Sequence, residues 1–307
     1  MRSQIGRKLR SIATTLVVLV LLSPGNAGAQ DLDPRRYINL PVSQNFLRVA
    51  LGYSDGEVNV SPGIPVEGAN LTVTGFSLGY LRSMNLGGKV ASFDVHIPRL
   101  CATGSGVLDG EQLSRDTCGA GDANVRLTYN FFGAPALELS EFAKRKKEVV
   151  VGASIQVSVP TGQYDPEHLV NIGANRWVLR PEIGMSIPWR NWSLDVAAGV
   201  RFFSDNDEYL VDQTFSQDPL YNLQAHLIYD LSNGHWISLD TNYFFGGETY
   251  RDDQPAAIRQ ENSRLGVNWY ILVNSKLGVR LTANTGVVTR VGNDSNTFSL
   301  AALYRWE

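Results

Sequence analysis

The chain has 307 residues, of which 43% are hydrophobic and 10% aromatic, and its formal net charge at pH 7 is -3. Because a near-neutral chain without a domain-scale basic face lacks the electrostatic footprint of a nucleic-acid-binding protein, we expect no nucleic acid among its partners. Its 29 glycines and its aromatic content favour β structure over helix.

The first 29 residues are typical of an export signal. A basic start precedes an apolar run at 12–22, and the Ala-Gly-Ala triplet at 27–29 offers a small-residue cleavage site before Gln30. The alternative is a membrane anchor, but the apolar run has about eleven residues whereas a spanning helix needs roughly 20. We therefore expect a signal peptide at 1–29 and an exported protein.

Beyond this signal, apolar and polar residues alternate with a period of two, which is typical of strands with one apolar face. Between Pro219 and Leu231, for example, the odd positions are apolar and the even positions mostly polar. No charged residue falls on the apolar faces of the clearest segments. In chain order, the pattern predicts twelve strands, at 46–53, 71–82, 88–97, 123–132, 148–160, 176–187, 191–203, 219–231, 235–246, 262–272, 275–288 and 296–306.

An even number of strands is what a closed antiparallel barrel needs if both chain ends lie on one side. About ten residues rising about 3.3 Å each at a tilt near 45° climb roughly 24 Å, the height of the apolar band of outer-membrane barrels. We therefore predict an all-β fold, a transmembrane antiparallel up-and-down β-barrel at 46–307. The segment at 30–45 would be periplasmic or would plug the barrel.

Short and long connections alternate along the predicted strands, as they do between the periplasmic and extracellular sides of such barrels. The long connections are at 54–70, 98–122, 161–175, 204–218 and 247–261. Two connections depart from this rule, because 133–147 is long on the periplasmic side and 289–295 is short on the outside.

Three local signals refine the strands. Pro181 removes a ladder donor in mid-strand, so we expect a bulge or a local distortion there. The apolar parity of the second strand changes midway, and a bulge near Gly75 would reconcile its two halves. The Ser-Asn-Gly sequence at 232–234 predicts a tight hairpin turn.

The two cysteines, Cys101 and Cys118, lie in one Gly- and Ser-rich connection. Export implies an oxidising compartment, so we expect a local disulfide between them. Closing a loop of this size stabilises a fold by about 3 kcal/mol in the chain-entropy model. A metal site would need further ligands nearby, and because none are grouped there we predict no metal.

Charged residues on the polar parity are candidates for the lumen lining, because an arginine that faces lipid at the bilayer midplane costs about 2–4 kcal/mol. These candidates are Arg48, Asp94, Arg126, Arg180, Glu182, Asp195, Arg201, Asp230, Asp240, Arg264 and Arg280. Either they line a pore with both signs of charge, or they form salt bridges that only fill and stabilise a small barrel. The segment at 31–45 would then close the lumen from the periplasmic side.

Three alternatives compete with a channel. A soluble β-sandwich shares the alternation but buries the apolar parity as its core. An outer-membrane lipid hydrolase would place a Ser-His pair on the lipid side, whereas His96 and His226 fall on the polar parity. No catalytic or nucleotide motif is present, so we predict no catalytic residue and no cofactor. A structural barrel with binding loops would use the acidic clusters at 165–167 and 205–208, which could hold a hard cation.

Several segments also carry a family resemblance. They are DLDPRRYINLPV at 31–42, GDANVRLTYNFFGAPAL at 121–137, SVPTGQYDPEHLVNIGANRW at 158–177, DNDEY at 205–209, QDPLYNLQAHLIYDL at 217–231 and NSRLGV at 262–267. Together they resemble the outer-membrane barrel family labelled "putative MetA-pathway of phenol degradation". The resemblance implies transport of aromatic compounds and carries over no individual site residue.

The function that we expect is a bacterial outer-membrane channel or transporter for small solutes, among them aromatic or hydrophobic compounds. Its expected partners are outer-membrane lipid, the small-molecule solute and the barrel-assembly machinery. The last predicted strand presents aromatics on one face, as a substrate of that machinery does, although Glu307 follows the final aromatic.

Overall fold

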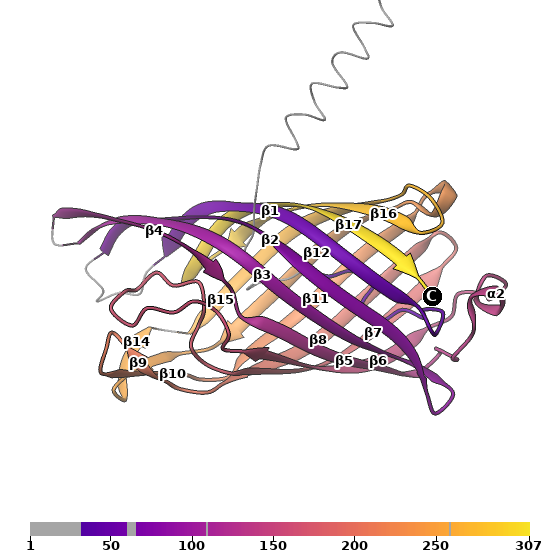
Figure 1. Cartoon of the computed structure of the whole chain (residues 1–307), viewed down its shortest axis with the longest axis horizontal. Helices are drawn as coiled ribbons and strands as arrows, with labels where there is room; N and C mark the ends of the chain where they lie inside the picture. Colours follow the sequence, from indigo (N-terminus) through magenta and orange to yellow (C-terminus); the bar gives the residue numbers. More distant parts are fainter. Residues whose placement is uncertain (1–31, 60–65, 109, 258) are drawn as a thin grey trace, which may run out of the picture.

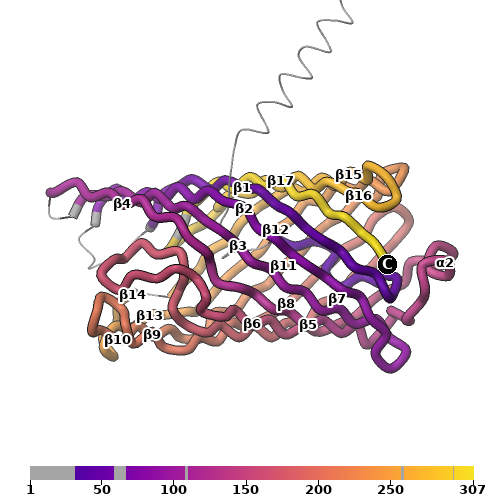
Figure 2. The backbone as a smooth tube through the Cα atoms, in the orientation of Figure 1, coloured from indigo at the N-terminus to yellow at the C-terminus, as the bar shows by residue number. Residues whose placement is uncertain are grey.

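The computed structural model describes residues 32–59, 66–108, 110–257 and 259–307. The predicted signal peptide at 1–29 lies outside these residues. None of the described helices is long and apolar enough to cross a membrane. Figures 1 and 2 show that strands dominate the described chain.

Twelve antiparallel strands form a closed wall. The main sheet has 13 strands, and all of them except β4 follow one another around the wall. The pairing of β2 with β3 closes the wall. The wall strands are β1 Asn45–Asn59, β2 Val66–Leu86, β3 Lys89–Leu108, β5 Ala123–Phe132, β6 Val150–Val159, β7 Val178–Trp189, β8 Trp192–Phe203, β11 Leu220–Asp230, β12 Trp236–Gly246, β15 Gln260–Leu272, β16 Leu277–Val288 and β17 Gly292–Trp306. The predicted twelve-stranded up-and-down barrel is confirmed.

The two faces of the wall have opposite polarity. Burial alternates residue by residue along β11 and β12. Leu239 is 50% exposed on the outside, whereas its neighbour Asp240 is 0% exposed on the inside. A soluble β-sandwich would bury the leucine and expose the aspartate. An apolar outer face around a polar interior is instead the distribution of a membrane-spanning barrel.

Aromatic side chains gather near both ends of this apolar face. Trp192 packs against Tyr229 with ring centroids 4.7 Å apart near one end, and Tyr221 stacks on Phe245 at 5.2 Å near the other. These are the positions of the two aromatic girdles that lie at membrane–water interfaces. Trp236, although near a strand end, is buried on the inner face.

The barrel has a turn end and a loop end. The C-terminus and the short turns lie at the turn end, together with the short helix α2 (Leu139–Phe142) in the long connection between β5 and β6. The predicted turn at 232–234 forms as a 3-10 turn (η1), in which Asn233 and Gly234 adopt φ values of 59° and 79°. The opposite, loop end carries most of the long connections (Figure 1).

The long connections are more regular than the sequence predicts. Three of them contain strands, namely β4 Glu111–Ala120, β9 Asn206–Tyr209, β10 Gln213–Gln217, β13 Thr249–Arg251 and β14 Gln254–Ala257. β4 extends β3 as a hairpin beyond the wall, and the other four form a small separate sheet. The predicted loop at 54–70 is largely taken up by β1 and β2. Outside the membrane both faces of a strand have similar surroundings, so no polarity alternation marks these strands.

The predicted disulfide is confirmed. Cys101 of β3 and Cys118 of β4 are register partners and are bonded to each other. The bond therefore ties together the hairpin at the loop end, outside the barrel wall.

The predicted bulge near Gly75 is wrong. β2 keeps its register with both neighbours through Gly75, and the shift lies between Glu67 and Asn70. The apolar residues of β2 change parity because Leu71 faces inward, whereas Phe76 and Leu78 face outward. At the loop end the Leu71 side chain lies with that of Val170 against Gly104. At Pro181 the pairing with β8 is interrupted but resumes in the same register, so there is a local distortion without a bulge.

Candidate functional site

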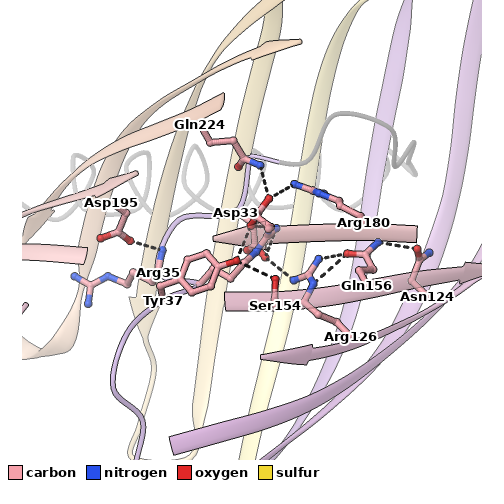
Figure 3. Close-up of polar contacts among 12 residues, drawn as sticks. Asp33, Arg35, Tyr37, Asn124, Arg126, Ser154, Gln156, Arg180, Asp195 and Gln224 are labelled. Carbon is pink, nitrogen blue, oxygen red and sulfur yellow. Dashed lines mark hydrogen bonds and ion pairs between the residues drawn. The ribbon is translucent and has the colours of Figure 1, made fainter. Parts of the chain in front are cut away.

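The interior of the barrel holds a stretch of chain that belongs to no strand. Residues 32–44, named here the inner segment, lie among inward-facing side chains of the wall (Figure 3). Arg35 and Ser43 adopt left-handed φ values of 64° and 63°, which fold the segment back on itself. Its Leu32, Tyr37 and Val42 side chains are buried.

Asp33 lies among three arginines. Its carboxylate is 3.3 Å from the Arg36 guanidinium, 3.6 Å from that of Arg126 on β5 and 3.2 Å from that of Arg280 on β16. Burial raises the pKa of the Asp33 carboxyl, but these cations outweigh it and hold the pKa well below its ordinary value. Asp33 therefore joins opposite parts of the wall through the segment.

Arg36 makes a second link to the wall. It pairs with Glu182 of β7, and the same carboxylate accepts a 2.6 Å hydrogen bond from Arg180. The Arg36 and Glu182 side chains are only 7% and 1% exposed. A buried pair of this kind is costly to break from one side, because the remaining charge loses its partner away from water.

Arg35 makes a third link, to β8 and β11, the strands that follow β7 around the wall. Its backbone N–H donates a 2.8 Å hydrogen bond to Asp195 of β8, and its guanidinium pairs with Asp230 of β11. The guanidinium also lies 5.1 Å from the ring centroid of Trp236, a cation–π contact. Trp236 faces inward because it shares the parity of Ser238 and Asp240 on β12, and Arg35 supplies a partner for its ring.

Tyr37 is the aromatic anchor of the segment. Its hydroxyl lies 2.9 Å from Ser154 Oγ and donates to Glu182 Oε1 at 3.0 Å. Burial, followed by the nearby Glu182 carboxylate, raises the pKa of this hydroxyl, so it stays protonated and able to donate.

The base of the segment closes the turn end of the barrel. Leu40 and Val42 pack against Val90, Ala134 and Val150, and the Val42 N–H bonds the Leu137 carbonyl at 2.9 Å. Higher in the lumen, a cavity of about 10 Å³ is bounded by Asp33, Arg36, Tyr37 and side chains of β7, β8 and β11. That is about the space of one water molecule. The inner segment therefore packs closely against these three strands.

One family accounts for most of the chain. The model of the family described as "Putative MetA-pathway of phenol degradation" matches residues 51–303. The chain belongs to this family. No curated protein matches the chain in sequence.

Solved structures place the MetA-pathway chain among outer-membrane barrels. The COG4313 outer membrane channel from Pseudomonas putida F1 is 20% identical with a TM-score of 0.74, over 90% of this chain and 100% of that chain. The transport unit of the autotransporter AIDA-I from Escherichia coli is 8% identical with a TM-score of 0.52, over 90% and 93%. The beta domain of the Bordetella autotransporter BrkA is 12% identical with a TM-score of 0.50, over 86% and 98%. At such identities the likeness concerns the fold, which is that of a bacterial outer-membrane β-barrel.

The predicted lumen residues of this barrel fall into two groups, those at the inner segment and those away from it. The group at the inner segment contains Arg126, Glu182, Asp195, Asp230 and Arg280, which contact it, and Arg180, which reaches it through Glu182. Asp94 pairs in register with Arg126, and Arg48 lies against the inner side of Gly79. The second group lies outside these contacts: Arg201 stacks over Phe244, Arg264 bonds Asn284, and Asp240 bonds Asn268.

Four residues of the inner segment were not predicted individually, namely Asp33, Arg35, Arg36 and Tyr37. The sequence does place them in a segment expected to be periplasmic or a plug. Their partners on the wall lie between 93 (Asp33 to Arg126) and 247 (Asp33 to Arg280) residues away in sequence, however, so no local pattern identifies the pairs.

The residue types of a hydrolase come together but in the wrong order. His226 Nδ1 lies 2.8 Å from Asp240, and Ser238 Oγ donates to the same carboxylate at 2.8 Å. A catalytic serine needs its hydrogen bond to the histidine, not to the aspartate. All three side chains are buried in the lumen wall, so an acyl chain in lipid does not reach them.

The acidic loop clusters are engaged with neighbouring side chains. Asp165 lies 3.2 Å from Arg115 and 2.8 Å from His168, and Glu208 accepts a 3.0 Å hydrogen bond from Asn175. Across the described parts of the chain, no three histidine, cysteine or acidic side chains gather as a metal site.

Proposed function

We propose that this chain is an outer-membrane channel for small solutes, with aromatic or hydrophobic compounds as its solute class, and that the inner segment is its removable plug. One observation carries the proposal: the segment that lies inside the lumen is held there by side-chain ion pairs with the wall and belongs to no strand. Its backbone pairs with the wall at its base, where Ser43 and Gln44 exchange two hydrogen bonds with Ser83 of β2. The departure of the residues above that base leaves every strand pairing of the wall in place.

The character of the contacts supports a plug more than a permanent core. Inside the lumen, the segment is held mainly by Asp33, Arg35 and Arg36, whose partners are charged side chains of the wall. When water enters the lumen it solvates the separated charges, so undocking costs far less free energy than exposing a packed apolar core would. The polar inner wall is therefore suited to both the closed and the water-filled state.

The orientation follows from the connections. Outer-membrane barrels keep short turns in the periplasm and long loops outside. The turn end, where the inner segment joins β1 and the chain ends, then faces the periplasm, and the plug enters from that side. Insertion by the barrel-assembly machinery after export, with cleavage of residues 1–29, completes the proposal.

The solute class rests on the family. The family description concerns phenol degradation, and the similar structure from Pseudomonas putida F1 is titled an outer membrane channel. Transport rather than catalysis is proposed, since Ser238, His226 and Asp240 are not arranged for acyl transfer.

Uptake into intact Gram-negative cells tests this function, because a lipopolysaccharide leaflet slows the diffusion of apolar solutes that would cross a phospholipid vesicle unaided. Cells producing the chain should take up radiolabelled phenol or toluene several-fold faster than cells with an empty vector. Uptake of a hydrophilic disaccharide serves as the control and should not change. Folded barrel in the outer membrane without any gain in aromatic uptake would contradict the proposal.

A further inference from the structure

A pair of glycines makes a notch in the inner wall of the barrel. Gly152 of β6 and Gly184 of β7 are register partners, and the ring of Tyr37 lies against both. A Cβ on Gly184 would come within 2.1 Å and 2.2 Å of the ring carbons Cδ2 and Cε2, and one on Gly152 within 2.9 Å of Cδ1. Neither glycine has a positive φ, so the backbone does not require glycine here. The missing side chains provide space for a flat ring.

Hydrogen-bond partners for a hydroxyl group lie at the far end of this glycine notch. The Tyr37 hydroxyl donates to Glu182 Oε1 at 3.0 Å and lies 2.9 Å from Ser154 Oγ, which can donate to it in return. Glu182 is held in place by its hydrogen bond from Arg180, which belongs to the wall and stays there without the inner segment. Hydrogen bonds to a charged partner are stronger than neutral ones, and the site loses one if the hydroxyl is absent.

The occupant of the notch is itself a phenol. The side chain of tyrosine is a para-alkylphenol, and every contact described here is made by its ring or its hydroxyl. We propose that the glycine notch is a binding site for free phenols, and that Tyr37 occupies it as an internal competitor whose displacement by a phenolic solute releases the inner segment. The binding site stands on its own geometry, whereas the release of the plug rests on the proposed channel function.

Competition sets how the release depends on concentration. Because Tyr37 is tethered, it meets the notch at a high effective concentration. The ion pairs of Asp33 and Arg36 stabilise the docked segment further. A free phenol shifts the equilibrium between the docked and the undocked segment only by its preference for the vacated notch. In the native chain, an excess of phenol is therefore needed to displace Tyr37. Weakening the ion pairs lowers the phenol concentration needed for release, because docking of the plug and binding of phenol in the notch exclude each other.

Vacating the notch tests the binding site directly. Deleting residues 32–38 removes the ring together with its backbone and leaves the wall unchanged, so 4-fluorophenol can place its fluorine where the tyrosine has Cβ. Titration of the refolded variant in micelles, followed by fluorine NMR, should show a saturable bound signal. Fluorobenzene, which lacks the hydroxyl, should bind about ten-fold more weakly or less.

Two matched variants in this deletion background distinguish binding in the notch from partition of the ligand into the micelle. Gly184→Ala puts a methyl group where the ring lies and should weaken 4-fluorophenol at least about ten-fold by steric exclusion. Ser154→Ala removes one hydroxyl and should weaken 4-fluorophenol while leaving fluorobenzene unchanged. Equal signals for both ligands in all three proteins would overturn the proposal.

The native chain tests the release. Trypsin cleavage after Arg36, read by mass spectrometry, should accelerate several-fold with phenol and not with benzene, because Arg36 is buried while the segment is docked. Cleavage after the exposed Lys144 is the internal control and should stay constant. Binding to the vacated notch without any phenol-dependent cleavage would overturn the competitor role. Binding and release without aromatic uptake by cells would instead contradict the proposed channel.

Discussion

Replacing Asp33 with asparagine should weaken the docking of the inner segment by about 2–3 kcal/mol. The substitution keeps the shape of the side chain but removes the charge that lies among Arg36, Arg126 and Arg280. Removing one partner of a fully buried ion pair costs about 3–5 kcal/mol. The Asp33 side chain is 25% exposed, so water screens part of the effect and the lower figure applies.

Proteolysis measures this loosening. A change of 2–3 kcal/mol raises the population of the undocked segment by roughly 30- to 150-fold, and cleavage in native conditions follows that population. Trypsin should therefore cut after Arg36 correspondingly faster in Asp33→Asn. The matched variant Asp116→Asn removes a carboxylate from the hairpin at the loop end and should leave this cleavage unchanged. Identical rates in the native chain and in Asp33→Asn would show that the ion pairs do not hold the segment.

Acid should not readily reproduce this substitution. The pKa of Asp33 lies well below its ordinary value in the docked state, so its contribution to docking is complete above that ordinary value. The contribution disappears only as the pH falls through the lower, docked-state pKa. The segment should therefore stay docked in mildly acidic buffers.

Placing arginine at Leu239 should lower the free energy of unfolding of the barrel by about 2–4 kcal/mol, because the side chain faces lipid between the two aromatic girdles. Urea unfolding in phospholipid bilayers measures the loss. The control is arginine at Leu231, an exposed leucine at the turn end of β11, where the cost should fall to about 0–1 kcal/mol. Equal losses at both positions would contradict a lipid-facing wall with an interface at the turn end.

The wall strands are predictable because a membrane barrel gives each strand two different surroundings. In β11 and β12 every second side chain meets lipid, and the others meet a polar lumen, so the sequence carries the period directly. The same reasoning fails for β4 and β10, which lie beyond the wall, where both faces have similar surroundings. Parity also places Trp236 with Asp240 on the inner face, but it does not identify Arg35 as the partner of its ring.

The candidate site is less predictable than the wall. Parity alone selects Glu182 and Arg280 as inward-facing, but it does not show that they meet residues of the inner segment. The glycine notch depends on the register of β6 with β7, which pairs Gly152 with Gly184. A glycine within a strand marks a bulge or a tight bend as often as a close approach, so its residue type alone does not indicate a notch. Contacts between distant segments become visible only once the barrel is closed.

Single-channel recording in planar bilayers tests the central claim, that the inner segment closes a channel, most directly. The refolded full-length barrel should be closed for most of the time, whereas a variant lacking residues 32–38 should conduct ions steadily. That deletion removes the contacts of Asp33, Arg35, Arg36 and Tyr37 with the wall and keeps Leu40 and Val42 at the base. A folded deletion variant that remains closed would mean that the side chains of the wall fill the lumen by themselves, and the account of a plugged channel would then be wrong.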